Sequence, residues 1–580
     1  ELGEYDGTAL MEFKTRKTVI YRIKDETACT YDYDDTPPFQ MNREALDIAL
    51  EIALMLKMNV VGELHIARKQ YLDGSIPAGF QRTGIIAIEG SIPLSNKTVR
   101  IIQLSVEEDS CREVSDIGHV RVFTTDRLGM PLMEMVTYPD MLTPDEAAEA
   151  GQYLRFVARS SGKVRTGMGA AREDVNVSIT GGTRVEIKGV SHIRWIPRLV
   201  HTEAFRQKAL LLIRDELKKR VVDPKTWRLA QREIDYGRVP SDHPLFQRAR
   251  AAKMQLTVVN LPKFAGLLSH FTQPGQTFAD ELSGRLKVIA CIEKPNMTHS
   301  EDVVSALTCH HWSELGRLLS AEDDDAQVLV FGPADDISTA LDVIEERCRL
   351  AMEGVPNETR KGLADGTNIF ERVLPGPDRM YPDTDSAPIS IDNDRIEAMR
   401  QELPVDVAAQ IHKLREWRVP KDTWVYLLKR NLVDLVERIV KDFEQDPVFV
   451  GSVIGHTLKH VEGISPRNDR FRYDKIYELF RFGKAQKLYD EILKVMVPIL
   501  YNHPHLTFES VLTAVEFSPY SMEQILSQVP SLRREFAEER TSPDPKAEVR
   551  WLMGSLRRCA IGNVCLEELR ARVEKEVGNV

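Results

Sequence analysis

The stretch that decides the fold runs from Asp126 to Arg206 and contains two segments of alternating character, Arg172-Glu-Asp-Val-Asn-Val-Ser178 and Arg184-Val-Glu-Ile-Lys-Gly189. Period-2 alternation predicts strands that pack one face and leave the other face free. The free face would carry charges of both signs, from Arg172, Asp174, Asn176, Ser178, Arg184, Glu186 and Lys188. Such a face is unusual in a purely structural sheet and typical of a site that binds phosphates, a metal ion and a carboxylate.

The composition is that of an ordinary globular protein, with 42% hydrophobic and 28% charged residues. A chain of 580 residues exceeds what one hydrophobic core usually serves, so we expect roughly three or four domains. The net charge of −11 excludes a general polyanion binder. Any surface that binds nucleic acid must therefore be local.

Seven scattered cysteines without a Cys-x-x-Cys motif favour a reducing compartment over a disulfide framework or a zinc knuckle. Cys309-His310-His311 lacks further ligands at metal spacing and is interpreted as part of an ordinary helix.

The longest apolar run, Ala45–Val61, contains charges at helical spacing and predicts an amphipathic helix, not a membrane span. Without a signal peptide, the protein is expected to be cytoplasmic. The chain starts at Glu1 without methionine, so we expect its natural N-terminus to lie upstream.

The N-terminal part is expected to consist mainly of strands, with three helices. The expected strands are Ala9–Thr15, Thr18–Ile23, Thr30–Tyr33, Ile85–Glu89, Val99–Leu104 and Val120–Thr124. The expected helices cover 43–58 with Asn42 as the cap, from Thr143-Pro144 to about Ser160, and from about Ile196 to Arg220.

The middle of the chain predicts a small inserted domain. Val221–His243 has the composition of a polar linker. Short strands then alternate with helices, which favours an α/β insertion. The expected strands are Val288–Cys291 and Val328–Phe331, and the expected helices are Ser300–Leu307 and Asp335–Ala351. Pro375–Asp385 is expected to be an irregular loop with too many charges for a linker, and the chain beyond Asp392 is expected to be helical.

Two basic stretches in the helical part, His412–Arg430 and Pro466–Lys487, are interleaved with aromatic residues. Cations neutralise phosphates, and aromatic rings stack on exposed bases. A solvated cationic face over aromatic core residues would give the same pattern. Both interpretations remain open from the sequence.

Two glutamates are the candidates for a metal site. Glu108 follows an expected strand, and Glu134 lies inside the apolar run Leu132–Val136, where a glutamate is either paired or a ligand. Mg²⁺ prefers oxygen ligands and often takes only one or two carboxylates. The alternative for Glu134 is a buried salt bridge with Arg184 or Lys69.

Phosphate binding by a Walker A loop is excluded, because Gly74–Gly79 is followed by Phe80-Gln81 where Lys and Ser or Thr are required. Arg68, Lys69 and Arg82 still place cations around a turn of small polar residues, which suits the capture of phosphate or carboxylate. A plain surface turn is the alternative. Nucleophilic catalysis has no support, since there is no Gly-x-Ser-x-Gly motif and no cysteine with histidine and acid partners.

Taken together, these residues resemble the GatB/GatE family of tRNA-dependent amidotransferases. The matching motifs occur in the family's order: Arg68-Lys-Gln-x-x-Asp-Gly-Ser75, Gly79-Phe-Gln-Arg-Thr-Gly84, Glu107-Glu-Asp109, Asp126-Arg-Leu-Gly-x-Pro-Leu-x-Glu134, Arg172-x-Asp-x-Asn-x-Ser178, Arg184-Val-Glu-x-Lys-Gly-Val190 and Arg379-Met-Tyr-Pro-x-Thr-Asp385. Leu261–Leu268, with Glu281 and Arg285, resembles a domain shared with bacterial aspartyl-tRNA synthetases. That domain favours the GatE branch of the family over the GatB branch.

The resemblance implies an α+β multidomain fold. It would comprise a mixed β-sheet cradle domain (1–240, returning at 366–395), an inserted α/β domain like that of aspartyl-tRNA synthetase (241–365), and all-α helical (396–490) and tail (491–580) domains. The implied activity consumes ATP, with Mg²⁺, to phosphorylate the glutamate of misacylated Glu-tRNA(Gln). Ammonia then displaces the phosphate.

The family motifs also imply roles for individual residues. Glu108 and Glu134 match the Mg²⁺ carboxylates, and Asp383 and Asp385 return to the cradle after the insertion. The expected catalytic residues are Lys69, Arg68, Glu186, Lys188 and Asp174, and those expected to bind ATP are Arg82, Arg172, Asn176 and Arg184. The family's opening Gly-Leu-Glu-x-His segment, which contributes to its metal site, has no match near Glu1-Leu2-Gly3. The metal site is therefore expected to be incomplete without that segment.

The implied partners are tRNA(Gln) charged with glutamate and an asparaginase-like subunit, GatD, which would release the ammonia and assemble with this chain as a heterotetramer. Two alternatives stay open. One is a non-catalytic relative that only binds tRNA, and the other is a GatB-like subunit of the trimeric enzyme, which the insertion disfavours.

Overall fold

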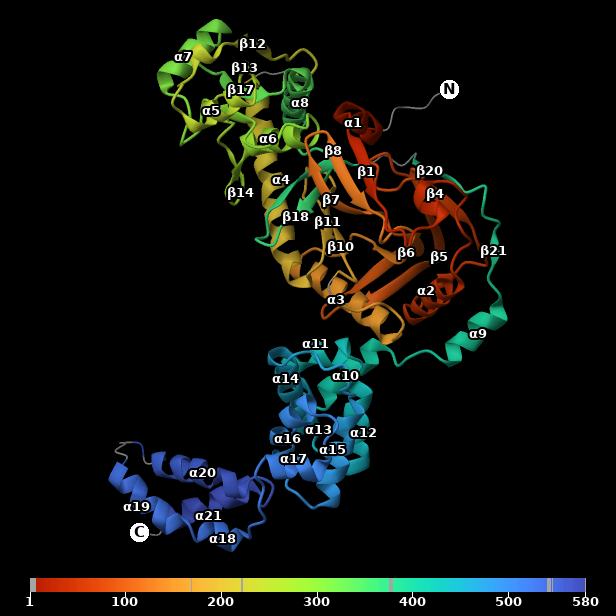
Figure 1. Cartoon of the computed structure of the whole chain (residues 1–580), viewed down its shortest axis with the longest axis vertical. Coiled ribbons are helices and arrows are strands. Elements are labelled where there is room, and N and C mark those ends of the chain that lie inside the picture. The colour runs from red at the N-terminus through yellow and green to blue at the C-terminus, as the bar shows by residue number, and fades with distance from the viewer. Residues whose placement is uncertain are drawn as a thin grey trace. The chain divides into compact units, whose positions relative to one another are not determined.

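The computed structural model describes residues 7–167, 169–220, 223–374, 379–539, 544 and 546–578 (Figure 1). The chain divides into two compact units, Glu1–Leu403 and Pro404–Val580. All strands of the described residues lie in the first unit, whereas the second unit is helical. The expected α+β class is therefore confirmed, while the finer division into five segments stays a prediction.

The first sheet is built on a long hairpin and is antiparallel throughout. Its strand order is β20 (Met380–Pro382), β4 (Ile66–Gln70), β5 (Phe80–Pro93), β6 (Thr98–Glu108) and β9 (Pro131–Thr137), and the short β2 (Asn59–Val60) also pairs with β5. Helix α2 (Arg43–Met55) packs on β5 and β6, and the side chain of Asn42 caps it by accepting a hydrogen bond from Ala45 N at 3.0 Å.

The second sheet contains the two alternating segments that open the sequence analysis. Its order is β10 (Glu173–Val177), β11 (Val185–Val190), β18 (Glu358–Gly362) and β19 (Asn368–Val373). The pair β11–β18 is parallel and the other two pairs are antiparallel. Val175, Val177 and Ile187 are buried against helix α4 (Ile196–Lys219), so the expected packed face is confirmed.

A third sheet has three strands in the order β1 (Thr18–Arg22), β8 (Val120–Thr124) and β7 (Arg112–Ile117). Helix α3 (Pro144–Ser160) begins as expected, since Thr143 Oγ1 accepts a hydrogen bond from Glu146 N at 3.2 Å. Shorter elements are α1 (Gly7–Thr15), β3 (Glu63–Leu64), β21 (Ile389–Ser390) and α9 (Asn393–Gln401).

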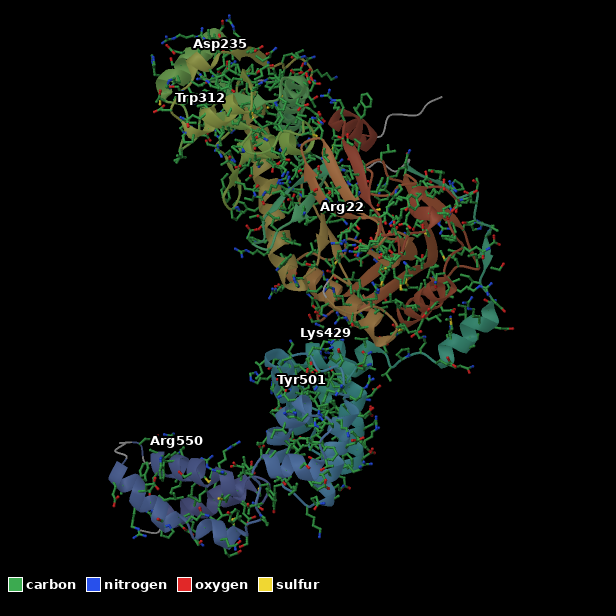
Figure 2. The ribbon with its side chains drawn as sticks, viewed as in Figure 1. Arg22, Asp235, Trp312, Lys429, Tyr501 and Arg550 are labelled. Atoms are coloured by element: carbon green, nitrogen blue, oxygen red, sulfur yellow. The ribbon has the colours of Figure 1, made fainter. Side chains whose placement is uncertain are left out.

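The segment between α4 and β18 folds around its own antiparallel sheet of order β12 (Ala230–Ile234), β13 (Gln255–Leu261), β17 (Ala326–Gly332) and β16 (Met297–His299). Its helices are α5 (Pro244–Ala251), α6 (Phe278–Val288), α7 (Cys309–Leu318) and α8 (Ala334–Glu353), and β14 (Phe271–Gln273) pairs with β15 (Gln276–Thr277). Trp312, labelled in Figure 2, is buried in one of its two cores. The expected α/β insertion is corrected here, because a sheet without parallel strands makes this segment α+β.

A buried cluster of charged residues joins this segment to the second sheet. Arg206 of α4 is fully buried and bonds Glu203, Glu281 of α6 and Glu358 of β18. Three further buried arginines complete the cluster: Arg285, Arg347 and Arg360. Burial opposes the ionisation of Glu281, but Arg206 and Arg360 outweigh it and hold the pKa of Glu281 well below its ordinary value. The cluster therefore stays charged although it is shielded from water.

Two expected strands near the N-terminus are wrong. Ala9–Thr15 lies in helix α1, whose Met11 is buried in the core around α4, α6 and α8, so tertiary packing decides its conformation. Thr30–Tyr33 is a short 3₁₀ helix. There the carboxylate of Asp32 accepts hydrogen bonds from the backbone N–H and the thiol of Cys29, a local bond that competes with strand pairing.

Three expectations in the middle of the chain are also wrong. The expected polar linker, Val221–His243, contains β12. This strand is an exposed edge strand, and its polar residues gave the segment the composition of a loop. Val288–Cys291 ends helix α6 and then bends; a short apolar run does not distinguish a strand from a buried helix end. Ser300–Leu307 is a series of turns, with Val303 and Val304 99% and 94% exposed. Of the expected loop Pro375–Asp385, residues 375–378 lie outside the described residues, and Met380–Pro382 forms β20.

The second unit is helical, as expected for the chain beyond Asp392. Its α-helices are α10 (Val407–Glu416), α11 (Lys421–Lys429), α12 (Val433–Phe443), α13 (Pro447–Ser452), α14 (Lys459–Ile464), α15 (Asp474–Ala485), α16 (Glu491–Asn502), α17 (Phe508–Ala514), α18 (Met522–Leu526), α19 (Val529–Glu539), α20 (Ala547–Ala560) and α21 (Leu566–Gly578). No helix in the described residues of either unit has the length and apolar character needed to cross a membrane. All seven cysteines are free thiols.

The buried charge cluster predicts a large effect for Glu281→Gln. The change leaves four buried arginines facing two glutamates, so we expect the free energy of unfolding to fall by about 3–5 kcal/mol. Calorimetric unfolding of the whole chain measures the loss. Glu216→Gln, which changes a half-exposed carboxylate on α4 that pairs with Lys219 and Arg220, is the matched control and should cost at most about 0.5 kcal/mol. Equal effects of the two variants would show that the buried cluster adds nothing specific.

Candidate active site

One face of the first sheet collects polar side chains from β4, β5, β6 and β9. The register sets Lys69 opposite Gln81, and Thr83 opposite Glu107. It also sets Ser105 opposite Glu134. Since residues directly opposite one another in a sheet share a face, all of these side chains lie on the same side.

Glu107 is at the centre of this group. Its Oε1 lies 3.5 Å from Lys69 Nζ and accepts a hydrogen bond from Thr83 Oγ1 at 3.1 Å. Glu134 lies close enough to Glu107 for the two carboxyl groups to interact, and this interaction contributes to a raised pKa of Glu134.

The electrostatics of the group follow from burial and from this pairing. Burial, followed by the charge of Glu107, raises the pKa of Glu134 from 4.5 to about 7, although Lys69 opposes the shift. Burial disfavours the charged form of Lys69, but Glu107, Tyr71 and Glu134 outweigh it and raise the pKa of the lysine. The site therefore holds a charged ammonium group close to Glu107, together with Glu134, whose pKa is raised to about 7.

Arg68, Arg82 and Glu108 lie on the opposite face of the first sheet. Arg82 donates from Nε to both oxygens of Glu108 at 3.1 Å and also contacts it through Nη2. Arg68 donates to Asp383 at 2.8 Å and contacts Asp385, and its guanidinium lies 4.1 Å from the centre of the Phe80 ring. These contacts attach the chain after β20 to β4.

The structure thus separates the two glutamates expected to bind a metal. Glu134 meets Glu107, whereas Glu108 is on the other face of the sheet and is neutralised by Arg82. The metal role of Glu108 stays a prediction from its motif, and the geometry adds Glu107 as a candidate. Sequence reasoning did not separate the two neighbouring glutamates, because the face of each depends on the register of β5 and β6.

The second sheet presents the charged residues that its alternation predicts. Asn176 of β10 is opposite Glu186 of β11, which is opposite Thr359 of β18. Lys188 is opposite Lys361. The exposed Asp174 accepts a hydrogen bond from Gly189 N through Oδ1 at 2.8 Å.

Two arginines expected to bind ATP lie at the margin of this group. Arg172, just before β10, is exposed and reaches Asp109 at 3.7 Å. Arg184, just before β11, is also exposed. Their roles stay predictions, since neither contacts Lys69, Glu107 or Glu134 in the described structure.

The polar faces of the first and second sheets meet. Arg372 of β19 forms an ion pair with Asp73 at 3.0 Å, and its guanidinium lies 5.9 Å from the ring centre of Tyr71, two residues after Lys69. Asp174 is close enough for its charge to raise the pKa of Glu134. We call the charged residues of these two facing sheets the cradle site.

Sequence reasoning missed Glu371, which precedes Arg372 in β19. Thr359 is opposite Arg372 and Arg360 is opposite Phe370, so Glu371 is the extra residue of a β-bulge. Bulges often redirect a side chain beside an active site. The only signal in the sequence is the pair of adjacent charges, which does not reveal a bulge.

Several buried polar atoms of the cradle site have no hydrogen-bond partner among the described residues. The first sheet contributes Gln81 Oε1 and Ser105 Oγ, and β19 contributes Glu371 Oε2 and Arg372 Nε. Native proteins leave few buried polar atoms unpaired, so each needs an explanation. A bound substrate that supplies the missing partners is one.

The residues of the cradle site fit Mg²⁺. Glu107 and Glu134 offer neighbouring carboxylate oxygens, and burial together with the charge of Glu107 raises the pKa of Glu134, a shift that a bound cation would oppose. Mg²⁺ commonly takes two protein carboxylates and completes its shell with water and phosphate oxygens. Among the described residues, the one group of three possible ligands close together is Glu322, Asp324 and Asp325, and Lys263 bonds the first two.

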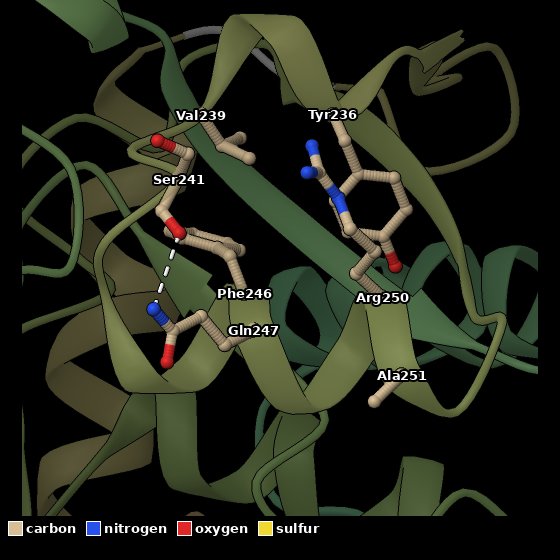
Figure 3. Close-up of a pocket in the computed structure, with 7 residues that line it drawn as sticks. All are labelled: Tyr236, Val239, Ser241, Phe246, Gln247, Arg250 and Ala251. Carbon is tan, nitrogen blue, oxygen red and sulfur yellow. Dashed lines mark hydrogen bonds between the residues drawn. The ribbon is translucent and has the colours of Figure 1, made fainter.

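A separate pocket of about 250 Å³ lies between α5 and the preceding loop (Figure 3). Its lining residues are Tyr236, Val239, Ser241, Phe246, Gln247, Arg250 and Ala251. The guanidinium of Arg250 lies 5.0 Å from the centre of the Tyr236 ring. None of the charged residues of the cradle site lines this pocket, so the two are distinct.

In the second unit, the aromatic residues of Pro466–Lys487 are engaged in packing. The ring of Phe471 lies 5.0 Å from that of Tyr501, and the ring of Phe482 lies 5.4 Å from that of Phe508. Arg470 and Arg472 are exposed and have no ion pair within the described residues. The packing favours aromatic rings with a structural role beneath a free cationic face.

Comparison with known proteins identifies likenesses over the whole chain. The model of the GatB/GatE catalytic domain matches residues 15–397. The E subunit of the glutamyl-tRNA(Gln) amidotransferase of Methanocaldococcus jannaschii is 32% identical over 585 residues, which cover 100% of this chain and 90% of that protein. The E subunits of Methanopyrus kandleri and Pyrococcus furiosus are 35% and 34% identical, over 83% and 90% of this chain and 76% and 83% of those proteins.

The raised pKa of Glu134 predicts that Glu134→Gln stabilises the protein in alkaline but not in acidic solution. Ionised Glu134 destabilises the folded state, and this cost is absent below its unfolded pKa of 4.5 and complete above about 7. The glutamine amide can still donate a hydrogen bond to Glu107. With a chelator present, we expect the variant to gain up to about 3 kcal/mol near pH 8 and almost nothing near pH 4.5, measured by thermal unfolding. A variant less stable than the parent near pH 8 would mean that Lys69 fully compensates the charge.

Proposed function

Because the chain belongs to the GatB/GatE family, we propose that it is the subunit of a glutamyl-tRNA(Gln) amidotransferase that converts Glu-tRNA(Gln) to Gln-tRNA(Gln). The observation that carries the proposal is the contact of Lys69 with Glu107, beside Glu134 and opposite the charged face of the second sheet. A carboxyl group with a raised pKa near a lysine, in a site with unpaired buried polar atoms, is typical of catalysis.

The first chemical step is the transfer of a phosphoryl group. A γ-carboxylate oxygen of the esterified glutamate attacks the γ-phosphorus of ATP, a new O–P bond forms, and the bond to ADP breaks. The step is needed because a carboxylate would otherwise have to expel oxide, whereas phosphate is a good leaving group. Catalysis of phosphoryl transfer rests on positioning and charge neutralisation, and Lys69 and Lys188 offer positive charge for it.

Mg²⁺, when bound, would neutralise phosphate oxygens, and Glu107 and Glu134 are the residues proposed to hold it. The family motif favours Glu108 in place of Glu107, but the contact between Glu107 and Glu134 supports these two as the ligand pair. Arg172 and Arg184 are exposed cations at the margin of the cradle site and are proposed to contact ATP.

The second step is amidation. The nitrogen of ammonia attacks the activated carbonyl carbon, a C–N bond forms, and the C–O bond to the phosphate breaks. The nitrogen loses a proton, for which the carboxylates of the cradle site are acceptors. A GatD-like partner is proposed to release the ammonia from glutamine or asparagine, since the sequence offers no motif of a nucleophile with a supporting base.

The second unit is proposed to hold the tRNA, because Arg470 and Arg472 present exposed cations that form no ion pair with other described residues. A non-catalytic tRNA-binding relative would need only this part. The nearness of Glu107 and Glu134 favours the enzyme, since a purely structural site gains nothing from two carboxyl groups that repel each other. A GatB-like subunit of a trimeric enzyme is disfavoured by the likeness to archaeal E subunits along the whole chain.

The two candidate metal carboxylates can be separated by matched variants. We expect Glu107→Gln to reduce the hydrolysis of ATP that depends on Glu-tRNA(Gln) by at least about 100-fold, because the pair with Glu134 is lost. Glu108→Gln loses a contact with Arg82 on the other face and should stay within about tenfold of the parent. The assay contains this chain, GatD, glutamine, Mg²⁺ and Glu-tRNA(Gln), and Gln-tRNA(Gln) is measured in parallel.

If Glu108→Gln reduces the hydrolysis of ATP more than Glu107→Gln does, the metal would be assigned to Glu108. An inactive parent chain that still binds tRNA tightly would favour the non-catalytic relative.

The cationic face of the second unit predicts a change in salt dependence. Arg470→Glu with Arg472→Glu should weaken tRNA binding and reduce the slope of log affinity against log salt by about 1–2, since about two phosphate contacts are lost. Filter binding across salt concentrations measures the slope. Arg550→Glu, an exposed arginine of α20 that pairs with Asp544, is the control (Figure 2). An unchanged slope in the double variant would remove this face from the interface.

A further inference from the structure

We propose that the outward face of helix α4, together with the hairpin β14–β15, binds unpaired nucleotides of the tRNA. The inference rests on the proposed function and extends it, because it gives the first unit an RNA-binding surface apart from the cradle site. None of the motifs that carry the family resemblance contains a residue of this surface.

One face of α4 is exposed along most of the helix. Its residues are spaced alternately by three and four positions, which places their side chains in one row on an α-helix. They span about 21 Å at the rise of an α-helix. The row, which we call the α4 stripe, consists of Arg198, His201, Phe205, Lys208 and Leu212, all exposed.

Two exposed phenylalanines meet at the middle of the α4 stripe. Phe205 is 52% exposed, and Phe271 of β14 is 46% exposed. Their ring centres lie 5.8 Å apart in an edge-to-face arrangement, because β14 lies beside α4 (Figure 1). Such a pair leaves aromatic surface open to solvent, and bases of single-stranded nucleic acid stack on surface of this kind.

The hairpin that carries Phe271 is fastened to the second sheet. The buried Gln273 donates from Nε2 to Asn368 O at 2.8 Å and accepts from Asn368 N at 3.0 Å. The side chain of Asn368 in turn donates to Glu203 of the buried charge cluster at 3.1 Å. Because these bonds set the position of the hairpin in advance, binding at Phe271 costs little ordering of the chain.

The exposed charges of the α4 stripe are all positive. From residue 194 to residue 214 the sequence holds one acidic residue, Glu203, which is fully buried and bonded to Arg206. Arg198 and Lys208 form no ion pair with any other residue that the structure describes. In a chain with a net charge of −11, such a row is a local site for anions.

Arg198 is held at the end of the row by its surroundings. Its stem lies so close to Gly366 that a Cβ there would be 2.4 Å from Arg198 Cγ and Cδ. The adjacent Asp365 accepts hydrogen bonds from Thr367 N and Oγ1, at 2.9 and 2.7 Å. The guanidinium of Arg198 is thus positioned by packing, and its charge is left for a ligand.

The combination of cations and aromatic rings favours RNA over a protein partner. Lysine is depleted in protein–protein interfaces, whereas Lys and Arg supply the contacts to phosphate. Phe205 lies between His201 and Lys208, so a base stacked on its ring would bring its phosphate within reach of a cation. Bases inside a double helix have no free faces, so the surface suits unpaired nucleotides.

The experiment measures binding of uncharged tRNA(Gln) to the full chain across salt concentrations. We expect Phe205→Ala and Phe271→Ala each to weaken binding at least about fivefold and to keep the salt slope, because stacking releases no counterions. Phe205→Leu keeps apolar bulk without a ring and should behave like the alanine variant. Phe205→Tyr keeps the ring and should bind like the parent. Phe13→Ala, which removes an 80% exposed ring of α1, is the control.

The cations are tested by the slope itself. Lys208→Gln should reduce the slope of log affinity against log salt by about 1, since one phosphate contact is lost. Lys253→Gln removes an exposed lysine outside the α4 stripe and should leave the slope unchanged. Chemical probing of the tRNA should then reveal unpaired nucleotides that the parent protects and that stay reactive with Phe205→Ala.

Three outcomes contradict the inference. Parental affinity and slope in Phe205→Ala, Phe271→Ala and Lys208→Gln would overturn it, and the proposed function would stand if the parent still forms Gln-tRNA(Gln). Variants that lose binding of the GatD-like partner but not of tRNA would make the α4 stripe a protein interface. A parent chain that neither binds tRNA(Gln) nor supports amidation would overturn the proposed function and the inference with it.

Discussion

The cradle site depends on the buried charges beneath the second sheet. Strand β18 alternates so that Glu358 and Arg360 face α4 and α6, while Thr359 and Lys361 face the site. Shifting this strand by one residue would expose the buried charges and bury a lysine without a partner. The ion cluster around Arg206 thus penalises every register except the observed one. It contributes specificity more than stability, since Arg347 has three buried nitrogens without a hydrogen-bond partner among the described residues.

The charges on the first sheet are arranged in the opposite way, because they are not fully neutralised within the chain. Glu107 and Glu134 repel each other when both are ionised, and only a shared proton, Lys69 or a bound cation relieves the repulsion. The buried cluster beneath β18 pairs most of its charges within the chain, whereas the cradle site leaves more of this neutralisation to its ligands. Proteins often sacrifice stability at functional sites in this way, and the unpaired atoms of Gln81 and Ser105 beside the carboxyl groups follow the same pattern.

Local patterns in the sequence were enough for the features that depend on neighbouring residues. Alternation predicted β10 and β11 with their charged face, and capping residues predicted the starts of α2 and α3. Features set by distant contacts could not be predicted. The faces of Glu107 and Glu108 depend on the pairing of β5 with β6, and the direction of Glu371 depends on a bulge opposite β18. Helix α1 likewise takes its conformation from the core in which Met11 is buried.

The parallel pairing of β11 with β18 connects the inserted segment to the chemistry. Parallel neighbours cannot be joined by a tight turn, so a crossover must leave the end of β11 and return to the start of β18. Helix α4 begins that crossover, and the whole inserted segment completes it. Lys188 lies before the crossover and Lys361 after it, yet the two are direct neighbours in the sheet. The inserted segment is therefore part of what assembles the cradle site, because its folding decides whether Lys361 reaches its place beside Lys188.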